Sequence, residues 1–198
     1  MIGSITRGSK TERSIALVSL LTALSVSGAF AGCLVAVLGS AVSESARFGL
    51  GGLVIGLLLL IFALREFGWV YVPLLYSRWQ VPATWVRGSA LSRSLIWGML
   101  LGPGFLTMQP HPIFHAAIMW IFVWGDPGYG ALLGATLALF KALPVIAETL
   151  SPKMSTDWRL LPYSFALHIQ YTSGSLLLFS GLSLLAAVVI NLPASAKF

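Results

Sequence analysis

The sequence contains few charged residues and only one cysteine. Of its 198 residues, 9% are charged and 57% are hydrophobic, whereas a soluble globular domain carries about 25% charged residues. So few charges could not cover the surface of a water-soluble domain, and a soluble fold is excluded. The single cysteine, Cys33, excludes an intramolecular disulfide, a zinc-binding CxxC pattern and a two-cysteine redox relay within this chain.

The common motifs of membrane enzymes are also missing. The sequence has no Walker motif, no GxSxG, no HExxH and no pair of acidic residues inside an apolar segment. We therefore expect no enzymatic activity, with a membrane redox protein as the weaker alternative. The net charge is +6, but the basic residues lie in short loops between apolar blocks, where they indicate membrane topology. We expect no nucleic-acid partner.

Long apolar blocks are abundant instead. A membrane-spanning helix needs about 20 residues to cross about 30 Å of hydrocarbon. We therefore predict an all-α fold, a polytopic transmembrane helical bundle of about five spans with a proline-broken third span. The second block is short, but Trp69, Tyr71 and Val72 can extend it into an interfacial belt. The predicted segments are Ile15–Val42, Phe48–Ala63, Leu91–Trp124, Gly128–Ile146 and Leu160–Leu192.

The loop charges predict the orientation. With the N-terminus inside, nine basic residues lie inside and two outside, which favours five crossings with the N-terminus in and the C-terminus out. A re-entrant hairpin at Leu91–Trp124 would weaken this bias to eight against three, so one crossing is preferred. The inner residues are Arg7, Lys10, Arg13, Arg65, Arg78, Arg87, Arg93, Lys153 and Arg159, and the outer ones are Arg47 and Lys197.

No linker or low-complexity stretch divides the chain. We predict one integral membrane domain, 1–198, in the bacterial inner (cytoplasmic) membrane, with the lipid bilayer as its surroundings. Residues 1–14 form a basic cytoplasmic N-terminus, followed by an apolar stretch too long for a signal peptide. The segment 65–93 combines arginines with several tryptophans and tyrosines, and this mixture predicts a cytoplasmic loop on the membrane surface.

Prolines interrupt the third segment. Pro103, Pro110 and Pro112 each remove a helix hydrogen bond, and broken backbone at membrane depth requires burial in protein or a wet cavity. Transporters use such discontinuous helices as binding sites, and the alternative is a kinked packing helix. We predict a substrate path at this break, comprising Thr107, Met108, Gln109, His111, His115 and Lys141.

Met108, His111, His115 and Met119 would share one face of an unbroken helix. Thioether and imidazole together suit copper or another soft metal, so Met108, His111 and His115 are candidate metal ligands. The prolines disturb this register, and the same residues are equally suited to plain packing. A haem or chlorophyll ligated by histidine, with His168 as a further candidate, is a second alternative.

Lys141 is the one basic residue well inside an apolar segment. A charge at this depth is costly and marks a cavity or a partner, unless the side chain snorkels to the inner surface. Pro144 is expected to kink the same helix. Small residues at spacings of four, Gly28 with Gly32 and Gly130 with Gly134, predict close helix packing, as do Gly51, Gly52 and Gly56.

The order of these features resembles the transmembrane domain of the DsbD/CcdA family, within the wider group of LysE-type proteins. SGAFAGCLVAVLGSAV is similar to its second span and FGLGGLVIGLLLLIFALREFG to its third. WGMLLGPGFLTMQPHP stands where that family has a proline-cysteine helix, GALLGATLALFKALPVI resembles the next helix, and GSLLLFSGLSLL resembles the last. The family's first span, with its reactive cysteine, is missing, and so is the second reactive cysteine near Pro110. The resemblance implies a similar fold with a broken helix, without electron transfer by this chain alone.

Two functions fit these features. The first is a small transport-type protein that moves a small ion, including a soft metal, or a small solute past the broken third segment and Lys141. The second is a non-catalytic subunit of a respiratory, photosynthetic or cytochrome-assembly complex, in contact with other membrane subunits or with copies of itself. Five spans, seven tryptophans and few charges suit such a packing subunit.

Overall fold

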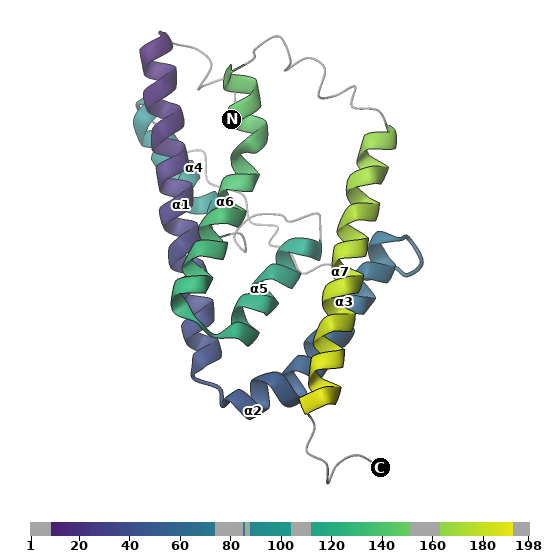
Figure 1. Ribbon diagram of the computed structural model, residues 1–198. Helices are drawn as coiled ribbons and strands as arrows, with labels where there is room; N and C mark the ends of the chain where they lie inside the picture. The colour runs from purple at the N-terminus through teal and green to yellow at the C-terminus, as the bar shows by residue number, and fades with distance from the viewer. Residues whose placement is uncertain (1–8, 74–84, 86–87, 104–111, 151–162, 192–198) are drawn as a thin grey trace. The chain divides into compact units, whose positions relative to one another are not determined.

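The computed structural model describes residues 9–73, 85, 88–103, 112–150 and 163–191, and every regular element in these ranges is helical (Figure 1). The prediction of an all-α fold is confirmed for this part of the chain. The elements are α1 (Lys10–Ser40), α2 (Glu44–Ala46), the π-helix η2 (Arg47–Gly51), α3 (Gly52–Glu66), α4 (Ala90–Leu101), α5 (Pro112–Trp124), α6 (Pro127–Leu150) and α7 (Tyr163–Asn191).

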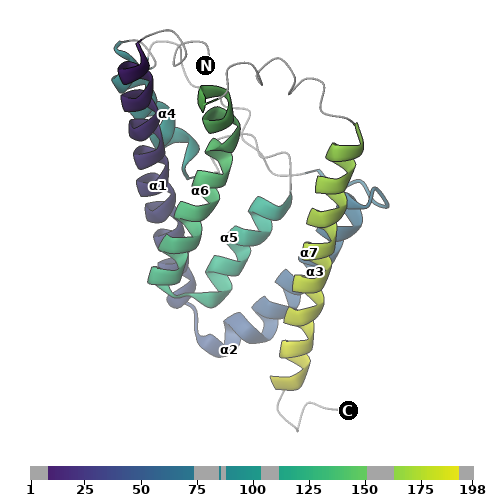
Figure 2. The ribbon, with the colours of Figure 1, turned by 45° about the horizontal axis from the view of Figure 1, so that its top comes forward.

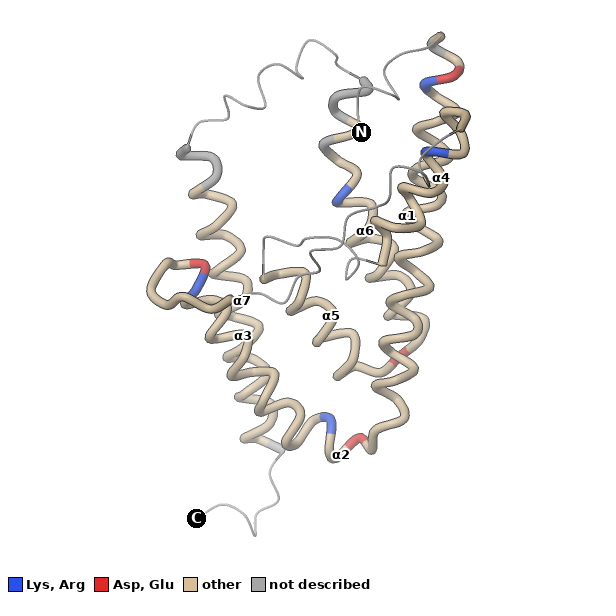
Figure 3. Tube along the Cα trace, turned by 180° about the vertical axis from the view of Figure 1, so that it is seen from behind, with Lys and Arg blue, Asp and Glu red and all other residues tan. Residues whose placement is uncertain are grey.

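Helices occupy each of the five predicted apolar segments. Three stretches are long and apolar enough to cross a bilayer, and they are Thr11–Ser40, Glu44–Glu66 and Leu167–Ile190. Charged residues lie near the ends of these helices, and the middle of α1 and of α7 carries none (Figure 3). This distribution keeps charge out of the hydrocarbon layer, where it is costly.

The second predicted segment reaches span length by extending at its N-terminal end, whereas the sequence predicted an extension toward Trp69. The helix begins at Glu44, because α2 and η2 continue into α3, and the stretch Glu44–Glu66 contains 23 residues. At the other end the helix stops at Glu66, and Gly68 adopts a positive φ of 77°. Glycine adopts this conformation without steric cost, so the chain turns before Trp69 and the aromatic residues lie beyond the helix.

The chain divides into two compact units. The first comprises Met1–Leu34, Tyr76–Gln109 and Pro127–Leu161, and the second comprises Val35–Leu75, Pro110–Asp126 and Pro162–Phe198. Whether these two units form the single integral domain predicted from the sequence is not tested by this division.

In the first unit, α1 and α6 lie side by side (Figure 2). They contact each other through glycines. A Cβ atom on Gly28 would lie 2.6 Å from the carbonyl oxygen of Gly134 and from the Cβ of Ala138, and one on Gly32 would overlap the carbonyl of Gly130. Only hydrogen atoms fit between these backbones, as the GxxxG spacings predicted. Beside this contact the two helices bury a core of Ala16, Leu20, Leu24, Ala138, Ala142 and Val145.

In the second unit, α3 packs along α7 in the same manner. A Cβ atom on Gly56 would lie 2.8 Å from two side-chain carbons of Leu185, and one on Gly181 would lie 3.0 Å from the carbonyl oxygen of Gly56. A buried core surrounds this contact, and α5 contributes Ala116 to it. The core consists of Leu59, Phe62, Ala63, Ala116 and Leu177. The glycines of the second segment therefore serve helix packing.

Candidate functional site

The third predicted segment contains two short helices. α4 ends at Leu101 and is followed by a turn at Gly102 and Pro103, while α5 begins at Pro112. Proline is favoured at a first helical position because the N–H it lacks would have no partner there. Pro112 is therefore the start of a helix. Five predicted path or break residues lie outside the described residues: Thr107, Met108, Gln109, Pro110 and His111.

The end of α4 packs tightly against α1. A Cβ atom on Gly98 would lie 2.5 Å from the Cβ of Ala23, and one on Gly102 would lie 2.7 Å from the carbonyl oxygen of Leu24. Gly98 and Gly102 thus form another pair of glycines four residues apart, and their spacing in WGMLLG could have been recognised in the sequence. This pair brings the final turn of α4 against the backbone of α1.

Lys141 contacts the end of this same helix. Its Nζ donates a hydrogen bond to the carbonyl oxygen of Leu101 over 3.4 Å, and the side chain is half-buried. The last four carbonyls of a helix have no partner within the helix, and a cation near a helix C-terminus is favoured by the helix dipole. Lys141 therefore joins α6 to the point where α4 stops, and the substrate path predicted at this break remains a prediction. Pro144 lies within the uninterrupted α6, and a kink at this residue remains a prediction.

The described part of the His/Met group takes part in packing. The rings of His115 and Phe62 meet edge to face, with centroids 6.3 Å apart and planes at 62°. Met119, one turn further along α5, packs against the core that contains Phe62. His115 and Met119 thus share a face of α5, as their spacing predicted, and this face lies against α3. His115 belongs to the second unit and Lys141 to the first.

Within the described ranges, no three histidine, cysteine, aspartate or glutamate side chains are placed to hold a metal ion. Two of the three predicted metal ligands, Met108 and His111, lie outside these ranges, so the metal site remains a prediction. His168, the further candidate for haem or chlorophyll, is exposed on α7.

Arg47 plays the same role at the end of α5 that Lys141 plays at the end of α4. Its Nη1 donates to the carbonyl oxygens of Val123 and Trp124, at 3.2 and 3.0 Å. Gly125 follows with a φ of 65°, the left-handed conformation that often ends a helix. In the sequence Arg47 was counted only as a loop charge, because nothing near it indicates a partner 76 residues away.

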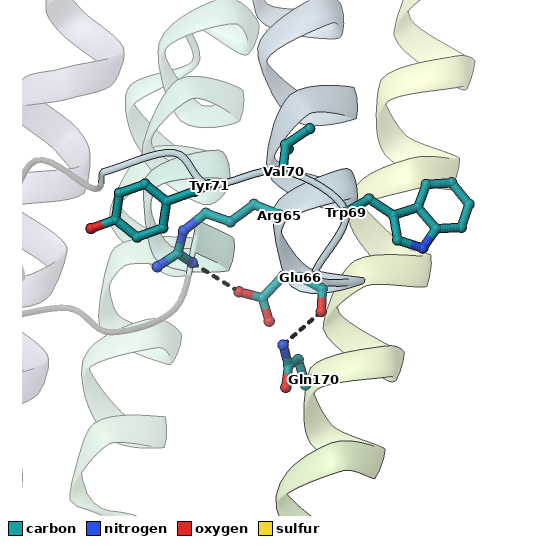
Figure 4. A pocket seen from close by; sticks show the side chains of 7 residues that line it. Arg65, Glu66, Trp69, Val70, Tyr71 and Gln170 are labelled. Atoms are coloured by element: carbon teal, nitrogen blue, oxygen red, sulfur yellow. Dashed lines mark hydrogen bonds and ion pairs between the residues drawn. The ribbon is translucent and has the colours of Figure 1, made fainter.

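A pocket that the sequence did not predict lies at the end of α3, where polar and aromatic side chains line it. Glu66 is 3% exposed, and its Oε1 lies 3.3 Å from Nη1 of Arg65. On α7, Gln170 donates from Nε2 to the backbone carbonyl oxygen of Glu66 over 2.7 Å (Figure 4). The cavity has a volume of about 630 Å³ and is lined by Arg65, Glu66, Gly68, Trp69, Val70, Tyr71 and Gln170.

The sequence prediction missed Glu66 because it ended the second span at Ala63. The helix continues to Glu66, so one buried acidic residue belongs to a helix long enough to cross a bilayer. In the sequence, Glu66 was assigned to the loop 65–93. Buried carboxylates require a partner, and the adjacent Arg65 supplies one.

No protein-family model matches this chain, and comparisons with curated proteins and with solved structures also find no match.

Proposed function

We propose that the chain is a small multi-pass membrane protein of transport type, with a pathway at the interruption after α4. The observation that carries this proposal is the hydrogen bond from Lys141 to the carbonyl oxygen of Leu101. A helix that ends beside an intramembrane cation resembles the discontinuous helices that line transport sites. The opposing interpretation is that Lys141 only caps α4.

The length of α4 supports a position inside the hydrocarbon layer. Its 12 residues extend about 18 Å, whereas the hydrocarbon layer is about 30 Å thick. A helix that begins near one surface therefore ends within the membrane. Its final carbonyls require a donor there, and an ammonium group that supplies one at this depth is typical of an ion or substrate path.

The packing directions within each unit support one crossing of the third segment. Along α1, Gly28 lies near Gly134 and Gly32 near Gly130, so α1 and α6 are antiparallel. A re-entrant hairpin at the third segment would instead make these two spans parallel. In the second unit α3 and α7 are antiparallel, because Gly52 lies near Val188 and Gly174 near Glu66. A hairpin would make this pair parallel too, so we propose five crossings.

The proposed substrate is a small ion or small solute. A soft metal such as copper is the specific candidate if Met108, His111 and His115 act together. The DsbD/CcdA-like arrangement of a broken helix and the location in a bacterial inner membrane are parts of the same proposal. The exposed apolar surfaces of the three long helices support membrane embedding.

Cysteine accessibility provides the test, because Cys33 is the only native cysteine. In a Cys33→Ser background, Pro103→Cys places a thiol in the turn after α4. We expect this thiol to react with a membrane-impermeant, charged methanethiosulfonate from both faces of oriented vesicles. The matched control is Phe179→Cys, a position 69% exposed near the middle of α7, which lipid should protect.

Gentle detergent extraction and native mass measurement distinguish the alternative function. A monomer or small homo-oligomer that carries copper, and loses it on combined His111→Ala and His115→Ala substitution, would support transport of a soft metal. An unreactive Pro103→Cys together with comigration in a large assembly would overturn the transport proposal. That result would identify a structural subunit of a membrane complex.

A further inference from the structure

The pocket at the end of α3 combines one accessible cation with aromatic side chains. Arg65 is 26% exposed, and its Nε donates to the carbonyl oxygen of Val72 over 2.8 Å. A second bond joins its Nη1 to Glu66. A guanidinium group has five N–H donors, so the two described bonds leave donors for a bound ligand. Glu66 and Val72 hold the guanidinium in a fixed position.

Two aromatic side chains lie near the guanidinium of Arg65, and both come from the segment that follows α3. Trp69 is 75% exposed and Tyr71 is 92% exposed. Figure 4 shows Tyr71 extending to the same side as Arg65 and Trp69 extending to the opposite side. Trp69 also contacts Phe67, with ring centroids 5.8 Å apart. Tryptophan and tyrosine beside a span are typical of the layer where lipid headgroups lie.

The place of the pocket in the chain agrees with that layer. It lies at the last turn of Glu44–Glu66, a helix long enough to cross a bilayer, so it is at the level where this helix leaves the hydrocarbon. The most abundant anionic group at that level is the phosphodiester of the phospholipids. Arginine binds phosphate oxygens through paired N–H groups, in a planar geometry that lysine lacks.

We propose that this pocket binds the phosphate group of a membrane phospholipid. Arg65 donates to the phosphate oxygens, and Trp69 and Tyr71 lie beside the glycerol region of the same lipid. Glu66 orients Arg65 and reduces the net positive charge of the pocket, so the site does not require a headgroup with additional negative charge. This inference does not depend on the transport proposal.

Native mass spectrometry of the full chain tests the proposal. The detergent-solubilised protein is mixed with phosphatidylethanolamine and phosphatidylglycerol, and retained lipid is measured as collision energy rises. Because hydrogen bonds to a charged group are among the strongest in proteins, we expect Arg65→Gln to lower lipid retention about tenfold. The control Arg93→Gln removes a half-buried arginine at the start of α4 and should retain lipid as the unmodified chain does.

Arg65→Gln alone removes a cation from beside the buried Glu66, which can destabilise the fold. The double substitution Arg65→Gln with Glu66→Gln removes both charges and should show the same loss of lipid retention. Trp69→Ser changes only an exposed residue and should weaken retention without unfolding. Unchanged retention in the double variant would overturn the proposal. Displacement of the lipid by inorganic phosphate alone would also overturn it, since the pocket would then bind a free anion.

Discussion

Ser27 of α1 donates a hydrogen bond to the carbonyl oxygen of Gly98 in α4, over 3.0 Å. The same hydroxyl lies 2.7 Å from the carbonyl oxygen of Ala23 in its own helix. A helix carbonyl that accepts a second bond from a neighbouring helix ties the two backbones together at one register. The glycine makes this approach possible, because any larger residue at position 98 would meet Ala23.

Ser27→Ala should destabilise the contact between α1 and α4. Hydrogen bonds between membrane helices contribute about 0.6 to 1.7 kcal/mol, and we expect a loss in that range. The measurement is unfolding in mixed micelles with increasing SDS, followed by the fluorescence of the seven tryptophans. Ser25→Ala is the matched control, because Ser25 donates within its own helix, to Leu21. Equal effects of the two substitutions would refute a specific role for the bond to Gly98.

Gly32→Ala should be strongly unfavourable, because its methyl group would overlap the carbonyl of Gly130 in α6. Overpacking of this kind costs about 1 to 3 kcal/mol. Gly49→Ala offers the opposite case, since nothing lies within 4 Å of a Cβ atom there. An added methyl group in a helix stabilises it by up to about 1 kcal/mol. A Gly32→Ala protein as stable as the Gly49→Ala protein would contradict the close packing of α1 on α6.

Lys141→Met should loosen the final turn of α4, because the carbonyl of Leu101 loses the donor from α6. We expect faster hydrogen–deuterium exchange in peptides that cover Gly98–Pro103, with little change in peptides from α7. Lys141→Arg keeps a cationic donor and should preserve slow exchange. Slow exchange in Lys141→Met would show that other groups satisfy this helix end, and would remove the main support for the proposed path.

Arg47→Met should affect the end of α5. The substitution removes the two hydrogen bonds that Nη1 donates to Val123 and Trp124. A hydrogen bond to a charged group contributes about 1.5 to 3 kcal/mol net. We expect a loss of about 2 kcal/mol in the same SDS titration. Arg47→Lys retains a cation with fewer donors, so its stability should lie between that of the unmodified chain and that of Arg47→Met. If Arg47→Met unfolds like the unmodified chain, the bonds to α5 contribute nothing to stability.

The sequence predicted contacts that depend on local spacing. Gly28 with Gly32, and Gly130 with Gly134, stand four residues apart, and the structure brings these two pairs together. The proline-rich third segment was expected to be interrupted, and α4 ends at Leu101 within it. Hydrophobic periods and small-residue spacings are properties of one helix, so a single sequence is sufficient to reveal them.

Contacts to backbone atoms were beyond sequence reasoning. Lys141 was recognised as unusual, but its acceptor is the carbonyl of Leu101, 40 residues away, and every residue has a carbonyl. Arg47 was missed for the same reason. Glu66 was missed because hydropathy alone ended the span three residues too early, at Ala63, whereas backbone hydrogen bonds continue the helix through Glu66.

The short length of α4 has a consequence for biosynthesis. Cellular insertion machinery releases helices of about 20 apolar residues into lipid, and the 12 residues of α4 fall well short. The glycines at the end of α4 pack against α1, which is synthesised first. The lysine that caps α4 is synthesised 40 residues after Leu101. We expect α4 to leave the translocon held by α1 and to settle only after α6 has emerged. Synthesis of α4 is therefore complete before α6 exists, but α4 becomes stable only once α6 supplies Lys141.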